Sequence, residues 1–264
     1  MKVFDWHREK HWTHCTAVIV AAGSATRMRG VDKIMADLDG EPVIAHTIRS
    51  FERVRCIDEI VVVAREDRLE QMRKLVEEKQ FHKVSAIVAG GKDRMASVQA
   101  GLEAASPETI LAAVQDGARP LVTEEIICKT VDMALSYHAA APAIPVKDTI
   151  KVVGEDGKVE STPDRTTLRA VQTPQIFDRD LLVAAWQRAK KEKLVYTDDC
   201  SAMEGLGVHV YLTEGSEENL KITTPLDLGV EGYTALEFRE GSETVLEGEG
   251  WMVITAENVD SLGF

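Results

Sequence analysis

A glycine loop that carries two cations lies near the start of the chain. An apolar run over Thr16–Ala21 leads into Gly23, and Arg27 and Lys33 follow it. Glycine lets a backbone come close to a ligand, and the amides of such a loop can form a nest for an anion. Arginine offers a planar fork of donors to phosphate oxygens, and lysine offers a point charge. These residue types at this spacing predict a site for an anionic ligand, although a lone cation is usually just a solvated side chain.

Two later loops also combine small residues with charged ones. In Gly90–Ser97, glycines permit close approach to a base or a ribose, and Arg94 and Ser97 lie one helical turn apart on the same face. In Asp116–Pro120, a carboxylate follows a predicted strand beside small residues, which suits a ribose or a water-mediated Mg²⁺. Taken alone, each loop is more often a helix start or a turn, so the functional interpretation depends on finding them together.

The reaction type follows from what the motifs lack. The chain has no P-loop pattern and no GxGxxG, and we find no nucleophile triad or acid–base dyad. Phosphoryl-type transfer needs positioning and charge stabilisation more than a covalent protein group. A phosphate monoester, with a second pKa of about 6, is already an anionic nucleophile at neutral pH. Such a site must supply positive charge, and the candidates are Arg27, Lys33, Arg94, Arg119, Arg165 and Lys221.

Predicted strands and helices alternate along most of the chain. Apolar runs predict strands over residues 16–21, 59–64, 84–89, 109–115 and 143–146. Between them we expect a helix with Pro42 at its first position and helices over residues 65–80, 93–105 and 123–138. This order indicates an α/β fold with a doubly wound, mostly parallel, Rossmann-like sheet, whose ligands bind outside the carboxyl ends of the strands. Later elements are expected over residues 178–191, 198–205 and 208–212 and from residue 224 onward.

A hairpin interrupts this alternation. Two extended runs, over residues 148–153 and 158–161, flank Gly154-Glu-Asp-Gly157, and Asp-Gly is a strong turn signal. We expect a β-arm over about residues 147–173 that projects from the sheet. A two-stranded arm is only marginally stable alone, so a second subunit is its simplest partner. The sequence therefore predicts a homodimer that forms through this arm.

Composition limits the function and the location. With 44% hydrophobic residues the chain is ordinary globular protein, and no apolar stretch reaches the roughly 18 residues of a membrane span. Its net charge of −13 argues against a nucleic-acid groove and requires that cations for an anionic ligand be gathered locally. The four scattered cysteines are expected to be reduced thiols, and the polar N-terminus has no signal-peptide core. We expect a cytoplasmic protein that binds neither membrane nor nucleic acid.

We expect the chain to divide into three parts. Residues 1–15 form an N-terminal extension, and residues 16–232 form the main α/β domain, which includes the β-arm. Residues 233–264 form an acidic C-terminal extension, since Lys and Arg are absent from Glu240 onward. A short edge strand over Trp251–Thr255 is possible within this tail, and a solvated appendage is the default expectation for such a charge excess.

Ordered motifs give the chain a resemblance to a known family. The motifs are Ala21-Ala-Gly-Ser-Ala-Thr-Arg-Met, Lys33, Gly90-Gly-Lys-Asp-Arg-Met-Ala-Ser-Val, Asp116-Gly-Ala-Arg-Pro, Pro145-Val-Lys-Asp-Thr-Ile-Lys, Thr173-Pro-Gln, Thr197-Asp-Asp and Asn219-Leu-Lys-Ile-Thr-Thr-Pro-Leu-Asp-Leu. From about Thr16 to Val230 the chain resembles the 2-C-methyl-D-erythritol 4-phosphate cytidylyltransferases of the non-mevalonate isoprenoid pathway. The resemblance implies a reaction of CTP with methylerythritol phosphate that gives a CDP-alcohol and pyrophosphate, with Mg²⁺ as the metal, and a dimer interface that the arm crosses.

The resemblance also implies residue roles. Gly23, Arg27 and Lys33 would meet the triphosphate, where the two cations stabilise charge on the α-phosphate and on the leaving pyrophosphate. The residues around the cytosine would be Ala21, Ala22, Gly91, Lys92 and Ser97, with Arg94 supporting their loop. Asp116 and Gly117 would meet the ribose, and Asp116 is the candidate metal ligand. The acceptor phosphate would be held by Arg119, Thr149, Arg165, Thr173 and Lys221. Among all these residues, the candidate catalytic set is Arg27, Lys33, Arg165 and Lys221.

The chain also departs from the family pattern at several positions. Ala25 replaces a usual second glycine, Ile34 a common glutamine, Gln115 a usual histidine, and Lys92 a frequent acid or small residue. None of these changes removes a candidate charge. The nearest rival activity is cytidylyl transfer to ribitol 5-phosphate, which the Gly-Ala-Arg-Pro and Ala-Ser-Val motifs disfavour. A regulatory nucleotide-binding protein and a dinucleotide-dependent oxidoreductase are the rivals from other classes.

Overall fold

The computed structural model describes residues 13–23, 32–224 and 226–228. The expectations for Ala25, for Arg27, for most of the N-terminal extension and for the acidic tail with its edge strand lie outside the described residues. Within the described ranges, no helix is both long and apolar enough to cross a bilayer.

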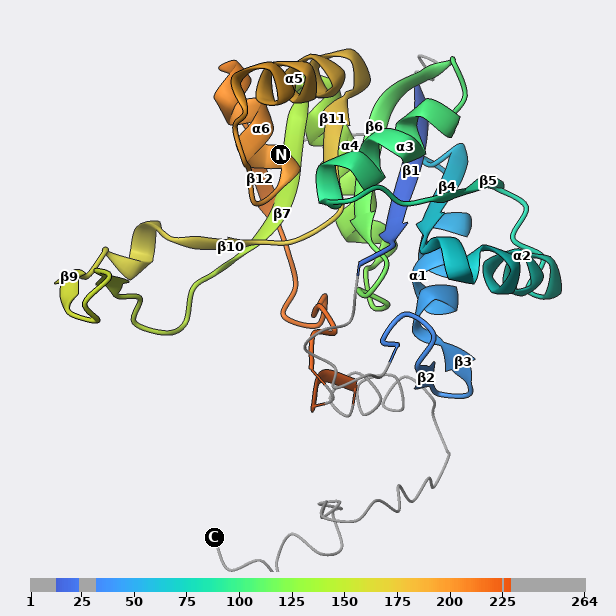
Figure 1. Cartoon of the computed structure of the whole chain (residues 1–264), viewed down its shortest axis with the longest axis horizontal. Helices are drawn as coiled ribbons and strands as arrows, with labels where there is room; N and C mark the ends of the chain where they lie inside the picture. Colours follow the sequence, from blue (N-terminus) through green and yellow to red (C-terminus); the bar gives the residue numbers. More distant parts are fainter. Residues whose placement is uncertain (1–12, 24–31, 225, 229–264) are drawn as a thin grey trace, which may run out of the picture.

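A twisted sheet forms the centre of the molecule (Figure 1). Its middle strand, β1 (His14–Ala21), lies parallel between β4 (Glu59–Ala64) and β6 (Thr109–Asp116), and β5 (Val84–Ala89) continues the parallel set beyond β4. Every residue of β4 is buried, which explains its unbroken apolar run. The sequence therefore predicted these strands well because helices cover both faces of the sheet.

The other half of the sheet departs from a simple parallel order. Strand β11 (Gln175–Asp178) is inserted between β6 and β7 (Ala139–Pro145) and runs antiparallel to both. The short strands β10 (Arg169–Val171) and β12 (Tyr211–Glu214) also pair with β7. The full order is β10-β7-β11-β6-β1-β4-β5, with β12 off this path. The expected α/β class with a mostly parallel sheet is confirmed, but strands β10 and β11 were not predicted.

Several element boundaries also differ from expectation. Strand β7 begins before residue 143 because its first residues are buried alanines, which lack a strand signal of their own. The late strand spans 211–214 rather than 208–212. Pro42 is not the first helical residue; it caps the next helix and pairs as part of β3 (Glu41–Pro42) with β2 (Asp37–Leu38). The helix expected over 65–80 starts with a 3₁₀ turn, η2 (Glu66–Arg68), and continues as α2 (Leu69–Glu78).

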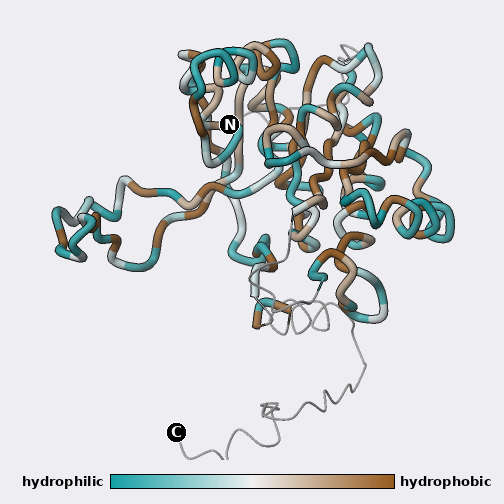
Figure 2. Tube along the Cα trace, in the orientation of Figure 1, coloured by the Kyte–Doolittle hydropathy of each residue, from teal (hydrophilic) through white to brown (hydrophobic). Residues whose placement is uncertain are grey.

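Helices cover both faces of the sheet. One core contains buried residues of α1 (Val43–Glu52), α2 and α4 (Glu124–Tyr137), and the other contains those of α3 (Arg94–Ala104), α5 (Arg179–Glu192) and α6 (Asp199–Leu206). Figure 2 shows hydrophobic residues concentrated along the strands, whereas α5 is largely hydrophilic on the outside. Each fully buried Ile, Leu or Phe contributes about 1.5–3 kcal/mol to this arrangement. The cores hold the strand ends, and hence the loops that follow them, in fixed positions.

The expected hairpin is present and projects from the body of the molecule (Figure 1). It consists of β8 (Val152–Val153) and β9 (Val159–Ser161), and Gly157 at its turn has a φ of +80°. A 3₁₀ turn, η3 (Arg165–Thr167), follows it before β10 rejoins the sheet. Val153 and Val159 are 52% and 56% exposed, so the arm leaves apolar surface open to solvent in a single subunit.

Candidate active site

Close backbone packing forms the floor of the site at the carboxyl ends of the parallel strands. A Cβ atom at Gly90 would lie 2.2 Å from the Cβ of Ala22, and one at Gly117 would lie 3.1 Å from the Cβ of Ala21. The amide of Gly117 also donates to the carbonyl of Val20 at 2.9 Å. Because Gly90 and Gly117 have no side chains, the Gly90–Ser97 and Asp116–Pro120 loops lie close against the end of β1, as the glycines in the sequence predicted.

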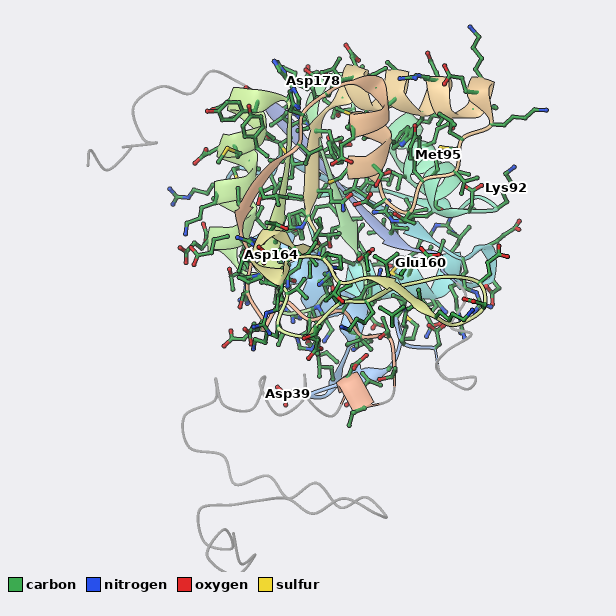
Figure 3. All side chains as sticks on the ribbon, turned by 90° about the vertical axis from the view of Figure 1, so that its left-hand side faces the viewer. Asp39, Lys92, Met95, Glu160, Asp164 and Asp178 are labelled. Atoms are coloured by element: carbon green, nitrogen blue, oxygen red, sulfur yellow. The ribbon has the colours of Figure 1, made fainter. Side chains whose placement is uncertain are left out.

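The loop before α3 is closed by its own hydrogen bonds. Asp93 caps the helix by accepting from the amide of Ala96 at 2.8 Å. The Ser97 hydroxyl donates to the Asp93 carbonyl at 2.8 Å and accepts from the Gly91 amide at 3.1 Å. Lys92 is exposed, and its side chain lies at the periphery in Figure 3. Ser97 therefore shapes this loop, whereas Lys92 extends into solvent.

Asp116, the last residue of β6, lies at the centre of a group of cations. Its Oδ2 atom is 2.8 Å from Lys221 Nζ and 3.5 Å from Arg119 Nε, and its side chain is only 13% exposed. Burial would raise the pKa of Asp116, but Lys221, Arg94 and Arg119 hold that pKa below its usual value. The carboxylate is therefore ionised at neutral pH and acts only as an acceptor.

Thr173 and Asn219 bring distant segments to Asp116. The amide of Asp116 donates to the Thr173 hydroxyl at 3.1 Å, and the Asn219 side chain donates to the Thr173 carbonyl at 3.0 Å. Arg119 in turn donates to the Asn219 carbonyl at 2.5 Å. Asn219 is fully buried, and the sequence indicated it only as the first residue of the motif that contains Lys221.

Lys33 reaches the same region from the other end of the chain. Its Nζ atom donates to the carbonyl of Ile222 at 3.1 Å, although the two residues are 189 positions apart. The amide of Ile222 donates to the carbonyl of Ala118 at 2.9 Å. The structure thus gathers Lys33, Arg119 and Lys221 near one strand end, as expected for a site that binds phosphates.

Arg94 is held by a partner that the sequence indicated only as the last residue of the Thr197-Asp-Asp motif. Its guanidinium donates to Asp199, the first residue of α6. Burial would lower the pKa of Arg94, but nearby carboxylates, including Asp199 and Asp116, raise it. Arg94 therefore remains charged between the two carboxylates, and its field contributes to the lowered pKa of Asp116.

The two candidate residues on the arm lie apart from this group. Thr149 and Arg165 are exposed, and Arg165 donates to the carbonyl of Lys147 at 2.6 Å within the arm. Figure 1 shows the arm directed away from the sheet, and Figure 3, which looks from the side of the arm, shows its residues Glu160 and Asp164 in front of the body. A single subunit therefore does not bring Thr149 and Arg165 to Asp116.

The donor set around Asp116 limits what metal the protein itself can hold. Among the described residues, no group of three or more His, Cys, Asp or Glu side chains is placed to bind a metal ion. Lys221 Nζ and Arg119 Nε both contact Oδ2 of the Asp116 carboxylate. Mg²⁺ commonly binds through one or two carboxylates together with substrate phosphates. Asp116 therefore fits a magnesium ion that arrives with a phosphate ligand.

Fold and site together define a nucleotidyltransferase: cations gather at the carboxyl edge of a doubly wound sheet, beside glycine loops suited to a nucleotide. Comparison with known sequences then identifies the family. The model for 2-C-methyl-D-erythritol 4-phosphate cytidylyltransferase matches residues 15–234, and the chain belongs to this family. The expected family, and with it the enzyme class, is confirmed.

Relatives and solved structures agree with this assignment. A protein from Caldanaerobacter subterraneus subsp. tengcongensis with the family's name is 44% identical over 217 residues, which are 81% of this chain and 96% of that protein. One from Halalkalibacterium halodurans is 46% identical over 214 residues, which are 81% and 93% of the two chains. The structure of 4-diphosphocytidyl-2C-methyl-D-erythritol synthase from Anaerococcus prevotii superposes with a TM-score of 0.75 at 30% identity and covers 85% of this chain and 99% of that one. These names favour methylerythritol phosphate over ribitol 5-phosphate.

Proposed function

We propose that this enzyme transfers the cytidylyl group of CTP to the phosphate of 2-C-methyl-D-erythritol 4-phosphate, a step in making isoprenoid precursors without mevalonate. An oxygen of the acceptor phosphate attacks the α-phosphorus of CTP. The bond from that phosphorus to the bridging oxygen breaks, and pyrophosphate leaves with its electron pair. The observation that carries the proposal is the convergence of Lys33, Arg119 and Lys221 near the ionised Asp116.

The cations suit this chemistry because two anions must be brought into contact. The acceptor is already ionised at neutral pH, so no general base is needed. Preorganised charges that face the developing negative charge lower the barrier without reorganisation during the reaction. We assign Arg27 and Lys33 to the α-phosphate and the leaving pyrophosphate, together with the Gly23 loop, and Arg119, Thr173 and Lys221 to the acceptor phosphate.

The nucleoside would bind along the glycine floor. We place the cytosine against the residues that surround the ends of β1 and the α3 loop, which are Ala21, Ala22, Gly91, Lys92, Arg94 and Ser97. The ribose would lie over Gly117 and Asp116, where a Cβ atom at position 117 would lie only 3.1 Å from the Cβ of Ala21. Bound Mg²⁺ would neutralise charge on the triphosphate, and Asp116 is the residue that would hold it.

We also propose that the enzyme works as a homodimer in which each arm completes the partner's site with Thr149 and Arg165. The exposed valines of the arm support this proposal, because an isolated two-stranded hairpin is marginally stable in water.

The four cysteines are free thiols, as expected, which supports a location in the reducing cytoplasm.

Mixing two inactive variants tests the shared site. Dimers that pair a Lys33→Ala subunit with an Arg165→Ala subunit contain one intact site if Arg165 acts across the interface. Random reassociation should then restore about a quarter of wild-type activity, because half the dimers are mixed and each has one intact site of two. No recovery in verified mixed dimers would contradict the shared site.

A pyrophosphate-release assay tests the activity itself. The enzyme is supplied with CTP, Mg²⁺ and one acceptor from a panel that includes 2-C-methyl-D-erythritol 4-phosphate and ribitol 5-phosphate. We expect efficient release only with the methylerythritol phosphate, and loss of release when EDTA removes the metal. A higher kcat/KM with ribitol 5-phosphate would overturn the proposed acceptor, and release that survives metal removal would overturn the role of Mg²⁺.

A further inference from the structure

Asp199 is a buried carboxylate that the proposed reaction does not use directly. Its side chain is 2% exposed and lies at the first position of α6. Two donors from different elements meet it: Arg94 of α3 bonds Oδ2, and the indole nitrogen of Trp186 of α5 lies 3.3 Å from Oδ1. A carboxylate buried this deeply is costly unless it is paired, so its position between these donors requires an explanation.

A side chain from the sheet fixes the start of α6. The Oε1 atom of Gln175, at the beginning of β11, accepts from the amides of Asp199 at 3.2 Å and Cys200 at 3.3 Å. Its amide nitrogen donates to Asp198 at 2.9 Å. Asp198 also caps the helix by accepting from the amide of Ser201 at 2.9 Å. Gln175 therefore anchors the start of α6 through two backbone amides and through the Asp198 side chain. Asp199 projects from this anchored helix end.

Arg94 transmits this anchoring to the loop that precedes α3. Arg94 is the first residue of α3, directly after Asp93, whose carbonyl accepts the Ser97 hydroxyl. That hydroxyl holds the amide of Gly91, so a displacement of Arg94 would move the loop at both ends. The bond to Asp199 spans 105 positions of sequence and ties the loop to α6, whose buried residues share a core with those of α3.

Arg94 interacts with two carboxylates, Asp116 and Asp199, whose pKa values are shifted in opposite directions. Burial raises the pKa of Asp199, and Arg94 and Trp186 offset only part of that rise. Asp116 also interacts with Arg94, and the two opposite charges stabilise each other. Without Asp199, the guanidinium would keep Asp116 and Asp198 as anionic neighbours but would lose the hydrogen-bond partner that fixes its position.

We propose that Asp199, with the Trp186 indole, is a positioning residue for nucleotide binding: it holds the Arg94 guanidinium in place and fixes the Gly91–Ser97 loop in the geometry that receives the cytosine of CTP. This inference rests on the proposed function, because it specifies which part of the substrate the network serves. Its effect falls on the nucleotide and not on the acceptor phosphate, which is assigned to residues of other segments.

Asp199→Asn is the most direct test. The substitution keeps the shape of the side chain and removes its charge, so Arg94 loses a charged hydrogen bond. The KM for CTP should rise about 10-fold or more, whereas kcat and the KM for the acceptor should change less than about 3-fold. Adding Asp199→Asn to an Arg94→Gln background should raise the KM for CTP no further, because the positioned group is already absent.

Two companion variants separate positioning from general loss of structure. Glu204→Gln removes an exposed acid from the same helix and should leave both KM values unchanged. Trp186→Phe removes the indole donor from Asp199, leaves a smaller ring in the core, and should raise the KM for CTP in the same direction by a smaller factor. If Asp199→Asn fails to fold, as judged by circular dichroism, the Trp186→Phe result decides.

The inference and the proposed function can fail separately. An unchanged KM for CTP in folded Asp199→Asn, or equal rises in both KM values, would overturn the positioning role. If the wild-type enzyme shows no turnover of CTP with methylerythritol phosphate, the proposed function fails instead. Calorimetric titration of CTP into the same variants then still measures the nucleotide affinity, and equal affinities in wild type and Asp199→Asn would overturn the inference.

Discussion

The two ends of the central sheet each contain a carboxylate with a lowered pKa, and they are built differently. At the amino end of β4, Glu59 accepts from the Thr16 hydroxyl at 2.8 Å, the Ser85 hydroxyl at 2.5 Å and the Ser106 amide at 2.9 Å. Burial would raise its pKa, but these neutral donors hold the pKa below its usual value. At the carboxyl end of β6, cations lower the pKa of Asp116.

The difference separates a carboxylate that serves the fold from one that serves the reaction. Hydroxyl and amide donors are the main partners of Glu59, with the His14 ring 3.5 Å away, so the group ties β1, β4 and β5 together at their starts. Arg94, Arg119 and Lys221 act on Asp116, and these three cations outnumber the two carboxylates, Asp116 and Asp199, with which they pair. In a chain with a net charge of −13, such a local surplus attracts anions to one place. The following experiments test this contrast.

The largest effect is expected from removing the lysine at the reactive end. Lys33→Ala should lower kcat about 10²–10³-fold while the affinity for CTP changes much less, because the charge acts mainly on the transition state. Steady-state kinetics and CTP titration measure the two quantities. Lys83→Ala is the matched control at the other end of the sheet, since Lys83 also donates to a carbonyl, that of Val54 at 2.6 Å. Equal losses of turnover and CTP affinity in Lys33→Ala would exclude the transition-state role.

Asp116→Asn should have the next largest effect. Loss of the carboxylate charge should lower kcat/KM about 10²-fold and raise the Mg²⁺ concentration needed for half-maximal rate, because an amide is a weaker magnesium ligand. A Mg²⁺ titration at saturating substrates measures the shift. An unchanged Mg²⁺ requirement in the folded variant would contradict the assignment of Asp116 as a metal ligand.

Glu59→Gln should change stability and leave catalysis intact. The free energy of unfolding should fall by about 1.5–3 kcal/mol, as expected for lost hydrogen bonds to a charged group, with kcat/KM unchanged at 25 °C. Because the folded-state pKa of Glu59 lies below its ordinary 4.5, its stabilisation is present above that pH and is lost as the pH falls through the folded value. Urea unfolding at neutral and acidic pH should therefore show a difference from wild type that shrinks in acid, and a constant difference would contradict this account.

The smallest effect is expected from a single donor at the same end. Ser85→Ala removes one hydroxyl from Glu59, and because Ser85 is exposed, water can replace it. The free energy of unfolding should fall by only about 0.5–1 kcal/mol, which thermal unfolding can resolve. A loss as large as that of Glu59→Gln would show that the donors do not act independently.

Prediction from the sequence succeeded where elements are long and covered on both sides. The strand over 59–64, an unbroken and fully buried apolar run, and the helix over 123–138 are confirmed because their patterns are local signals. The strand over 84–89 is also confirmed, although it lies at the sheet edge and contains the exposed Ser85. Strand β11 was missed because it is short and its placement between β6 and β7 depends on pairing with distant residues. The four cysteines are free as expected, but no spacing rule indicated that Cys56 Sγ lies 3.3 Å from Cys128 Sγ.

The sequence by itself determined the chemistry available to this enzyme: glycine loops, cations and one strand-end carboxylate in an order that identifies the family. Only the tertiary structure decided which charges act on one another, since Lys33 reaches Ile222 and Arg94 reaches Asp199 across large separations in the chain. The physical reason is that electrostatic and hydrogen-bond energies depend on distance and burial. A motif fixes neither of these, and packing on both faces of the sheet fixes both.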